Sequence, residues 1–121
     1  MARILIHSAT GPKNPTRAAL ALLLARTAVE EGHEVQVFLA GEGVHLADED
    51  KAAETNGLGT GAVSEHLAAL HERGMTIYLS GMSSEARGID GGEGFELAPP
   101  QKLVKLAVWK DSDLLSRRRS D

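Results

Sequence analysis

Short apolar runs recur along the chain, and each is followed by small polar residues and glycine. Residues 3–7 (RILIH) are typical of a strand buried on both faces, as in a parallel sheet, and we expect this strand to be central. Residues 34–39 (EVQVFL) and 75–79 (MTIYL) predict a second and a third strand. Each of these two strands is preceded by a helical pattern and a turn with charged residues and glycine, so the chain repeats one αβ unit.

Two helices are predicted between these strands. Thr16 is a suitable N-cap for a long helix that runs to about Glu31 and ends at Gly32. The apolar side chains of this helix cover more than half of its circumference, which indicates burial by the sheet and also by a second subunit. A second helix is predicted at residues 62–73, because apolar residues recur there at positions i, i+4 and i+7: Val63, Leu67 and Leu70.

The stretches beside the second and third strands give weaker signals. Residues 44–47 are compatible with one helical turn, but we expect residues 44–61 to be mostly irregular because their second half is rich in glycine. After the third strand, residues 83–88 predict a short helix, and residues 89–96 predict an irregular glycine-rich segment.

The C-terminal part predicts one more helix and one more strand. Pro100 suits the first turn of a helix, and residues 114–116 predict a short last strand. Alternation of helices and strands implies right-handed crossovers, so residues 1–121 are expected to form one α/β domain with a mostly parallel sheet. The inward-facing side chains of the last helix are expected to be Leu103, Val104 and Ala107.

Composition and charge narrow the class of protein. With 121 residues, 42% of them hydrophobic and 25% charged, the chain is typical of a globular domain. The net charge of -4 comes without a basic stripe, apart from the arginines at 117–119, which argues against nucleic acid as a partner. The N-terminal apolar run is too short for a signal peptide or a membrane span, so we expect no membrane partner and a cytoplasmic location.

Three polar loops follow the predicted strands, at residues 8–15, 40–44 and 80–84. In open parallel sheets, ligands bind beyond the carboxyl ends of the strands, so these loops should converge on one rim. Backbone amides at a helix start, with a nearby arginine, favour a small anionic ligand there. Each polar residue could instead serve only as a cap or turn former. The candidate ligand-binding residues are Ser8, Thr10, Asn14, Arg17, His45, Ser80, Gly81, Ser83, Ser84 and Arg87.

Several other chemistries lack their motifs. The segment Gly81–Glu85 lacks the second glycine of a serine-hydrolase elbow, and no histidine follows His71. His66 and His71 are five residues apart and would lie on different helix faces, so no metal site is expected. Glycines at 57, 59 and 61 do not follow a strand and have the wrong spacing for a nucleotide loop, and no cofactor is predicted.

The order of these features resembles the DsrE/DsrF-like family of small sulfur-relay proteins. The resemblance rests on Arg17 before an alanine-leucine helix, on a Gly-His pair before the second strand, and on Arg87-Gly88 after the third, and it covers nearly the whole chain. It implies a flavodoxin-like, three-layer α/β fold of about five strands and a homotrimer or hexamer. It also implies that Ser80 occupies the position of the cysteine that sulfurtransferase members carry at the end of the third strand.

The absence of cysteine decides between the functions that this resemblance offers. A persulfide relay needs a thiolate, and none of the 121 residues supplies one. One hypothesis is therefore a non-catalytic, homo-oligomeric module that binds a small anionic or nucleotide-like ligand at the rim or acts as a partner module, with no confident catalytic residue. The alternative is an enzyme that uses Ser80, His45 or His7 in acid-base chemistry.

Overall fold

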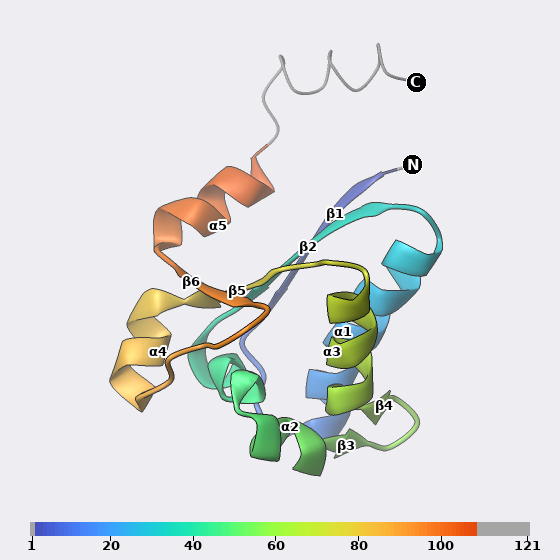
Figure 1. Cartoon of the computed structure of the whole chain (residues 1–121), viewed down its shortest axis with the longest axis horizontal. Helices are drawn as coiled ribbons and strands as arrows, with labels where there is room; N and C mark the ends of the chain where they lie inside the picture. Colours follow the sequence, from blue (N-terminus) through green and yellow to red (C-terminus); the bar gives the residue numbers. More distant parts are fainter. Residues whose placement is uncertain (1, 109–121) are drawn as a thin grey trace.

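A four-stranded parallel sheet forms the centre of the computed structural model, which describes residues 2–108 (Figure 1). Every pairing in this sheet is parallel, which confirms the expected α/β fold. The order of the strands in the sheet is β1-β2-β5-β6. The strands are β1 (Arg3–Ser8), β2 (Glu34–Leu39), β5 (Ile77–Ser80) and β6 (Phe95–Ala98).

Strand order and strand number differ from the expectation in two ways. Among the described residues, β1 pairs with β2 alone and lies at an edge, so its predicted central position is wrong there. The reason is that each crossover moves one place in the same direction across the sheet. The strand predicted at residues 114–116 lies outside the described residues, whereas β6 was missed within a segment expected to be irregular.

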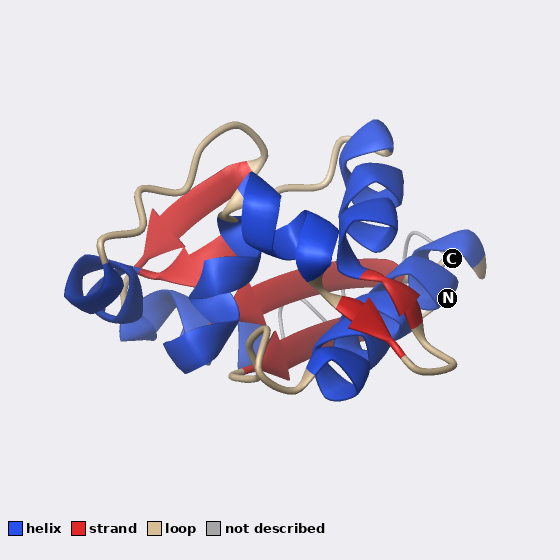
Figure 2. Cartoon of the chain, turned by 90° about the horizontal axis from the view of Figure 1, so that it is seen from below, coloured by secondary structure: helices blue, strands red, loops and turns tan. Residues whose placement is uncertain are grey.

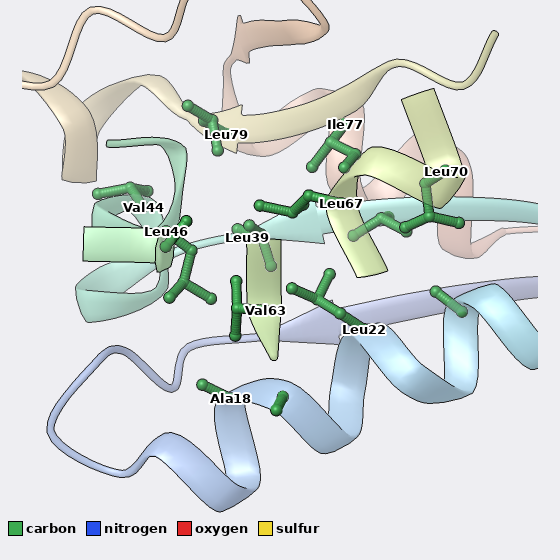
Figure 3. Close-up of a cluster of buried hydrophobic side chains, with 14 of the residues drawn as sticks. Ala18, Leu22, Leu39, Val44, Leu46, Val63, Leu67, Leu70, Ile77 and Leu79 are labelled. Atoms are coloured by element: carbon green, nitrogen blue, oxygen red, sulfur yellow. The ribbon is translucent and has the colours of Figure 1, made fainter. Parts of the chain in front are cut away.

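One face of the sheet carries the main hydrophobic core. It is covered by α1 (Pro15–Glu30) and α3 (Val63–Glu72). Figure 3 shows Leu22 of α1, Leu67 of α3 and Leu39 of β2 within this one cluster. Alternation along the strands places Phe38 on the other face, in a smaller cluster beneath the last helix.

Helices lie on both sides of the strands (Figure 2). The last helix, α5 (Pro100–Ala107), packs on the second face of the sheet. Leu106 is its buried residue and Leu103 is half-buried, whereas Val104 is 60% exposed and Ala107 is also exposed. The inward direction predicted for Val104 and Ala107 is therefore wrong. No helix in residues 2–108 has the length and apolar character needed to cross a membrane.

The start of α1 is set by Asn14 rather than by Thr16. The Asn14 side chain accepts a hydrogen bond from the Arg17 amide at 3.3 Å, and Pro15 occupies the first helical position. Thr16 instead connects α1 to a distant loop: its hydroxyl accepts from the Leu58 amide at 3.0 Å, and its carbonyl accepts from Thr60 at 3.1 Å.

The stretch at 44–61 is more regular than its composition suggested. A 3-10 helix η1 (Gly41–Ala47) is followed by α2 (Glu49–Glu54), and a small antiparallel hairpin joins β3 (Asn56–Gly57) to β4 (Gly61–Ala62). Asp48 begins α2 by accepting hydrogen bonds from the amides of Asp50 and Lys51. The contacts of Thr16 hold the hairpin against α1, a constraint that local periodicity does not carry.

Candidate functional site

The loops after β1, β2 and β5 meet at the carboxyl end of the sheet, as their sequence positions indicated. The Ala40 amide donates to the Ser8 carbonyl at 3.0 Å. The Gly41 amide donates to the Ser83 hydroxyl at 2.9 Å, which joins η1 to α4 (Gly81–Arg87). We refer to residues 8–15, 40–47 and 80–87 together as the rim.

Backbone segments within the rim approach each other so closely that two positions need glycine. A Cβ atom at Gly43 would lie 3.0 Å from the Ser8 carbonyl oxygen, and a Cβ at Gly11 would overlap the Glu42 carbonyl. Both glycines are buried. The loop after β1 therefore packs directly on η1.

Glu42 is the electrostatic centre of the rim. Its carboxylate accepts from Arg87 Nε at 2.7 Å and lies 3.3 Å from His45 Nε2. The hydrogen bond from Arg87 is the main reason that the pKa of Glu42 falls below its usual value of 4.5. Arg87 also donates through Nη1 to the Ser83 carbonyl at 3.1 Å, so its guanidinium is fixed on both sides.

The imidazole of His45 lies between the ammonium of Lys51 and the carboxylate of Glu42. Lys51 Nζ is 3.3 Å from His45 Nδ1, and because an ammonium only donates, Nδ1 accepts. The ring proton then resides on Nε2, which faces Glu42. A chain of polar contacts runs from Lys51 through His45 and Glu42 to Arg87.

A cavity of about 230 Å³ opens beside this chain of contacts. Sequence reasoning identified only His45 among its lining residues. Glu42 carried a signal that was not used, namely a charged residue between two glycines directly after a strand. The two lysines carried none, because their approach depends on how the loop after β1 and α2 fold together. The cavity is lined by Pro12, Lys13, Glu42, His45, Lys51 and Glu54.

The serine that ends β5 and the two serines of α4 have three different environments. Ser80 caps α4 by accepting from the Ser83 amide at 3.2 Å. Ser83 links α4 to Gly41, as described above. Ser84 is fully buried, and its hydroxyl has no hydrogen-bond partner among residues 2–108.

The remaining candidates at the rim have structural contacts. The Ser8 hydroxyl accepts from the Thr10 amide at 3.2 Å, and Asn14 caps α1. Gly81 is the first residue of α4, and Arg17 is exposed on the first turn of α1. These residues shape the rim or border it, and none of them lines the cavity.

The acid-base constellation of Ser80, His45 and His7 is not assembled by hydrogen bonds in the described part of the chain. His7 is exposed and its ring meets that of Phe38 edge-on, with 6.1 Å between the ring centres. His45 contacts Glu42 and Lys51, and Ser80 contacts the start of its own helix. The enzyme hypothesis gains no support from this geometry.

Metal ligands are also not grouped within residues 2–108. No set of three or more histidine, aspartate or glutamate side chains there is placed to hold an ion. His66 is buried and contacts the Thr60 carbonyl at 2.8 Å, whereas His71 contacts the Gly94 carbonyl at 3.2 Å. The two histidines thus have different surroundings.

Fold and rim together define a small parallel α/β protein with a polar site at the carboxyl end of its sheet, and comparison with known proteins gives its family. Residues 2–113 match the family model described as DsrE/DsrF-like, so the chain belongs to the DsrE/DsrF-like family. The crystal structure of the ychN protein from E. coli is similar in fold, with a TM-score of 0.71 and 20% identity over 92% of this chain and 96% of that one. An uncharacterized protein of Methanopyrus kandleri, MK0008, is 36% identical over an alignment of 109 residues that covers 84% of this chain and 82% of the relative.

Proposed function

We propose that this chain is a DsrE-like module that assembles with copies of itself and binds a small anion at the rim, without carrying sulfur as a persulfide. Membership of the DsrE/DsrF-like family supports a module of the sulfur-relay type. The finer parts of the proposal rest on the rim, on the composition of the chain and on the exposed side of α1.

The absence of cysteine supports the loss of sulfur transfer. A persulfide carrier needs a thiolate that attacks and holds a sulfane sulfur, and a serine hydroxyl forms no stable equivalent. The 121 residues contain no cysteine. Ser80, at the position where the resemblance places the family cysteine, accepts a hydrogen bond from the Ser83 amide and so acts as a helix cap.

Anion binding is supported by the charge balance of the cavity of about 230 Å³ at the rim, which we call the rim cavity. Arg87 already compensates the carboxylate of Glu42, at 2.7 Å. Among the other lining groups, the ammonium groups of Lys13 and Lys51 outnumber the single carboxylate of Glu54. A small anion in the cavity would meet a net positive charge and the ammonium donors of the two lysines.

A titration with orthophosphate, followed by amide chemical shifts, tests this site. We expect saturable shifts at Lys13 and at residues 42–51, and an affinity about two- to five-fold lower in Lys13→Gln and in Lys51→Gln, the range of an exposed ion pair. Lys105→Gln removes the same charge from α5 and should leave the affinity unchanged. Equal weakening in all three variants, or shifts without saturation, would contradict a defined site.

Self-assembly is supported by the outer side of α1. Leu20 and Leu24 are one helical turn apart and are 42% and 52% exposed. Light scattering should give three or six times the chain mass of 12.8 kDa. Leu24→Lys should lower that mass, whereas the 12.8 kDa mass for the unaltered chain at micromolar concentration would refute assembly.

Restoring a thiol tests what remains of a sulfur site. Ser80→Cys treated with polysulfide should gain the mass of one sulfur atom, because Ser80 is only half-buried. Ser84→Cys is the matched control, four residues further on and fully buried, and should gain none. If Ser80→Cys also takes up no sulfur, the surroundings of Ser80 no longer support this chemistry.

A further inference from the structure

A second and larger cavity, of about 550 Å³, lies on another side of α2. Its walls come from η1 and α2, from α3, and from the glycine-rich segment before β6, and we call it the α2–α3 groove. Glu49 and Ala52 of α2 line this groove, whereas Lys51 and Glu54 of the same helix line the rim cavity. The groove therefore shares no lining residue with the rim cavity, and its volume falls in the usual range for small-molecule sites.

Specific contacts fix the wall that β6 provides. His71 Nε2 lies 3.2 Å from the Gly94 carbonyl, and its ring meets Phe95 edge-on with 5.1 Å between the ring centres. A Cβ atom at Gly94 would lie 2.5 Å from the imidazole, so only glycine allows this approach. Gly91 and Gly92, with φ angles of 90° and 117°, bring the preceding backbone to the edge of the groove.

The chemistry of the lining is apolar with an excess of hydrogen-bond acceptors. Leu46, Leu67, Ala68 and Phe95 supply hydrocarbon surface. Among residues 2–108, the ionisable groups of the lining are the carboxylates of Glu49 and Glu93 and the imidazole of His71, with no lysine or arginine.

The polar groups of the groove have few contacts of their own. Within residues 2–108, neither Glu49 nor Glu93 has a side-chain hydrogen bond or ion pair. His71 donates through Nε2 to the Gly94 carbonyl, so in the neutral ring its Nδ1 is an acceptor. A ligand that complements these groups has an apolar body and a cationic donor.

We propose that the α2–α3 groove binds a small primary amine, with its hydrocarbon part against Leu67, Ala68 and Phe95 and its ammonium held by Glu49 and Glu93. An anion or a neutral alcohol of the same size would leave both carboxylates without a cation. This site is independent of anion binding at the rim, which uses other residues and another ligand charge.

Titrations of the full-length protein with hexylammonium, hexanol and hexanoate, at equal ionic strength and followed by amide shifts, test the proposal. Hexylammonium should bind saturably, with a dissociation constant on the order of 1 mM and with shifts at residues 68 and 91–93. Its affinity should exceed that of hexanoate by about ten-fold, because the groove repels a carboxylate. Equal affinities for the three probes, or no saturation with hexylammonium, would overturn the proposal.

Variants then locate the binding. Glu49→Gln and Glu93→Gln should each weaken hexylammonium binding about two- to five-fold. Glu54→Gln is the matched control, because it removes the same charge from α2 at a residue that lines the rim cavity, and it should leave the affinity unchanged. Ala68→Leu should also weaken binding, because the larger side chain occupies part of the groove. Weakening by Glu54→Gln as large as that by Glu49→Gln would show that only the net charge matters, and would refute a groove site.

Discussion

The rim cavity and the α2–α3 groove are lined by different faces of α2. The polar side chains of the rim and of the groove also differ in how they are used. At the rim, Ser80, Ser83 and Arg87 are engaged with backbone groups or with Glu42. In the groove, the carboxylates of Glu49 and Glu93 have no partner among the described residues. Polar side chains near a strand end are therefore no direct measure of binding capacity, because hydrogen bonds within the protein can occupy them first.

The largest expected effect is on the backbone contact that closes the rim. Gly11→Ala places a methyl group against the Glu42 carbonyl, so the loop after β1 must move away from η1. We expect a loss of about 1–3 kcal/mol in the free energy of unfolding, measured by denaturant titration. Gly81→Ala is the control, because its Cβ would make an ordinary contact of 3.5 Å with the Ala98 carbonyl. Equal losses in the two variants would show that the rim contact is not special.

Ser83 and Ser84 are adjacent, but only the hydroxyl of Ser83 has a hydrogen-bond partner among residues 2–108. Ser83→Ala leaves the Gly41 amide without its acceptor and should lower the free energy of unfolding by about 1 kcal/mol. Ser84→Ala removes a buried hydroxyl that has no partner among residues 2–108 and should be neutral or stabilising. Denaturant titrations of both variants give the comparison, and a larger loss for Ser84→Ala would reverse our assignment of the two roles.

The ion pair at the rim predicts a pH dependence that the groove should not share. Because the pKa of Glu42 is lowered in the folded protein, chiefly by its hydrogen bond to Arg87, the pair stabilises the fold above pH 4.5. This contribution is lost as the pH falls through the lowered value. Glu42→Gln should therefore show a shallower loss of stability on acidification than the unaltered protein, in thermal melts at low salt. The two profiles should converge at high salt, and parallel profiles at low salt would contradict the assigned pair.

The smallest expected effect on stability is in the groove. Glu93→Gln should change the free energy of unfolding by no more than about 0.5 kcal/mol, because its exposed carboxylate has no partner within residues 2–108. Its effect should be seen in ligand titrations instead. If Glu93→Gln lowers the free energy of unfolding as much as Ser83→Ala does, Glu93 is a structural residue. The groove would then not differ from the rim in having polar side chains without partners.

Sequence periodicity predicted the strands and helices that are marked by an apolar run or by helical spacing of apolar residues. The apolar runs of β1 and β2 and the i, i+4, i+7 spacing of α3 gave these elements to within a residue or two. The short strand β6 was missed because its four residues follow a glycine-rich segment and become a strand by pairing with β5. The cap of α1 was misplaced by two residues, because Asn14 and Thr16 are both good caps and Thr16 is engaged elsewhere.

The candidate site was predicted in location but not in composition. The loops after parallel strands share one edge of the sheet, so the meeting of Ser8, Ala40 and Ser83 followed from the order of elements. Lys13 and Lys51, which line the cavity, were not predicted. The groove was missed altogether, because its walls come from segments that show no common pattern in the sequence.

The sequence by itself determined the αβ repeat, the family resemblance and the lack of a thiol, since periodicity and residue identity are local properties. The tertiary structure decided which polar groups are already engaged. The Ser83 hydroxyl accepts a hydrogen bond from the Gly41 amide, 42 residues earlier in the sequence. Arg87 pairs with Glu42, 45 residues earlier. Hydrogen-bond partners this far apart are brought together only when the crossovers are complete, so the chemistry left at the rim and in the groove is a property of the folded chain.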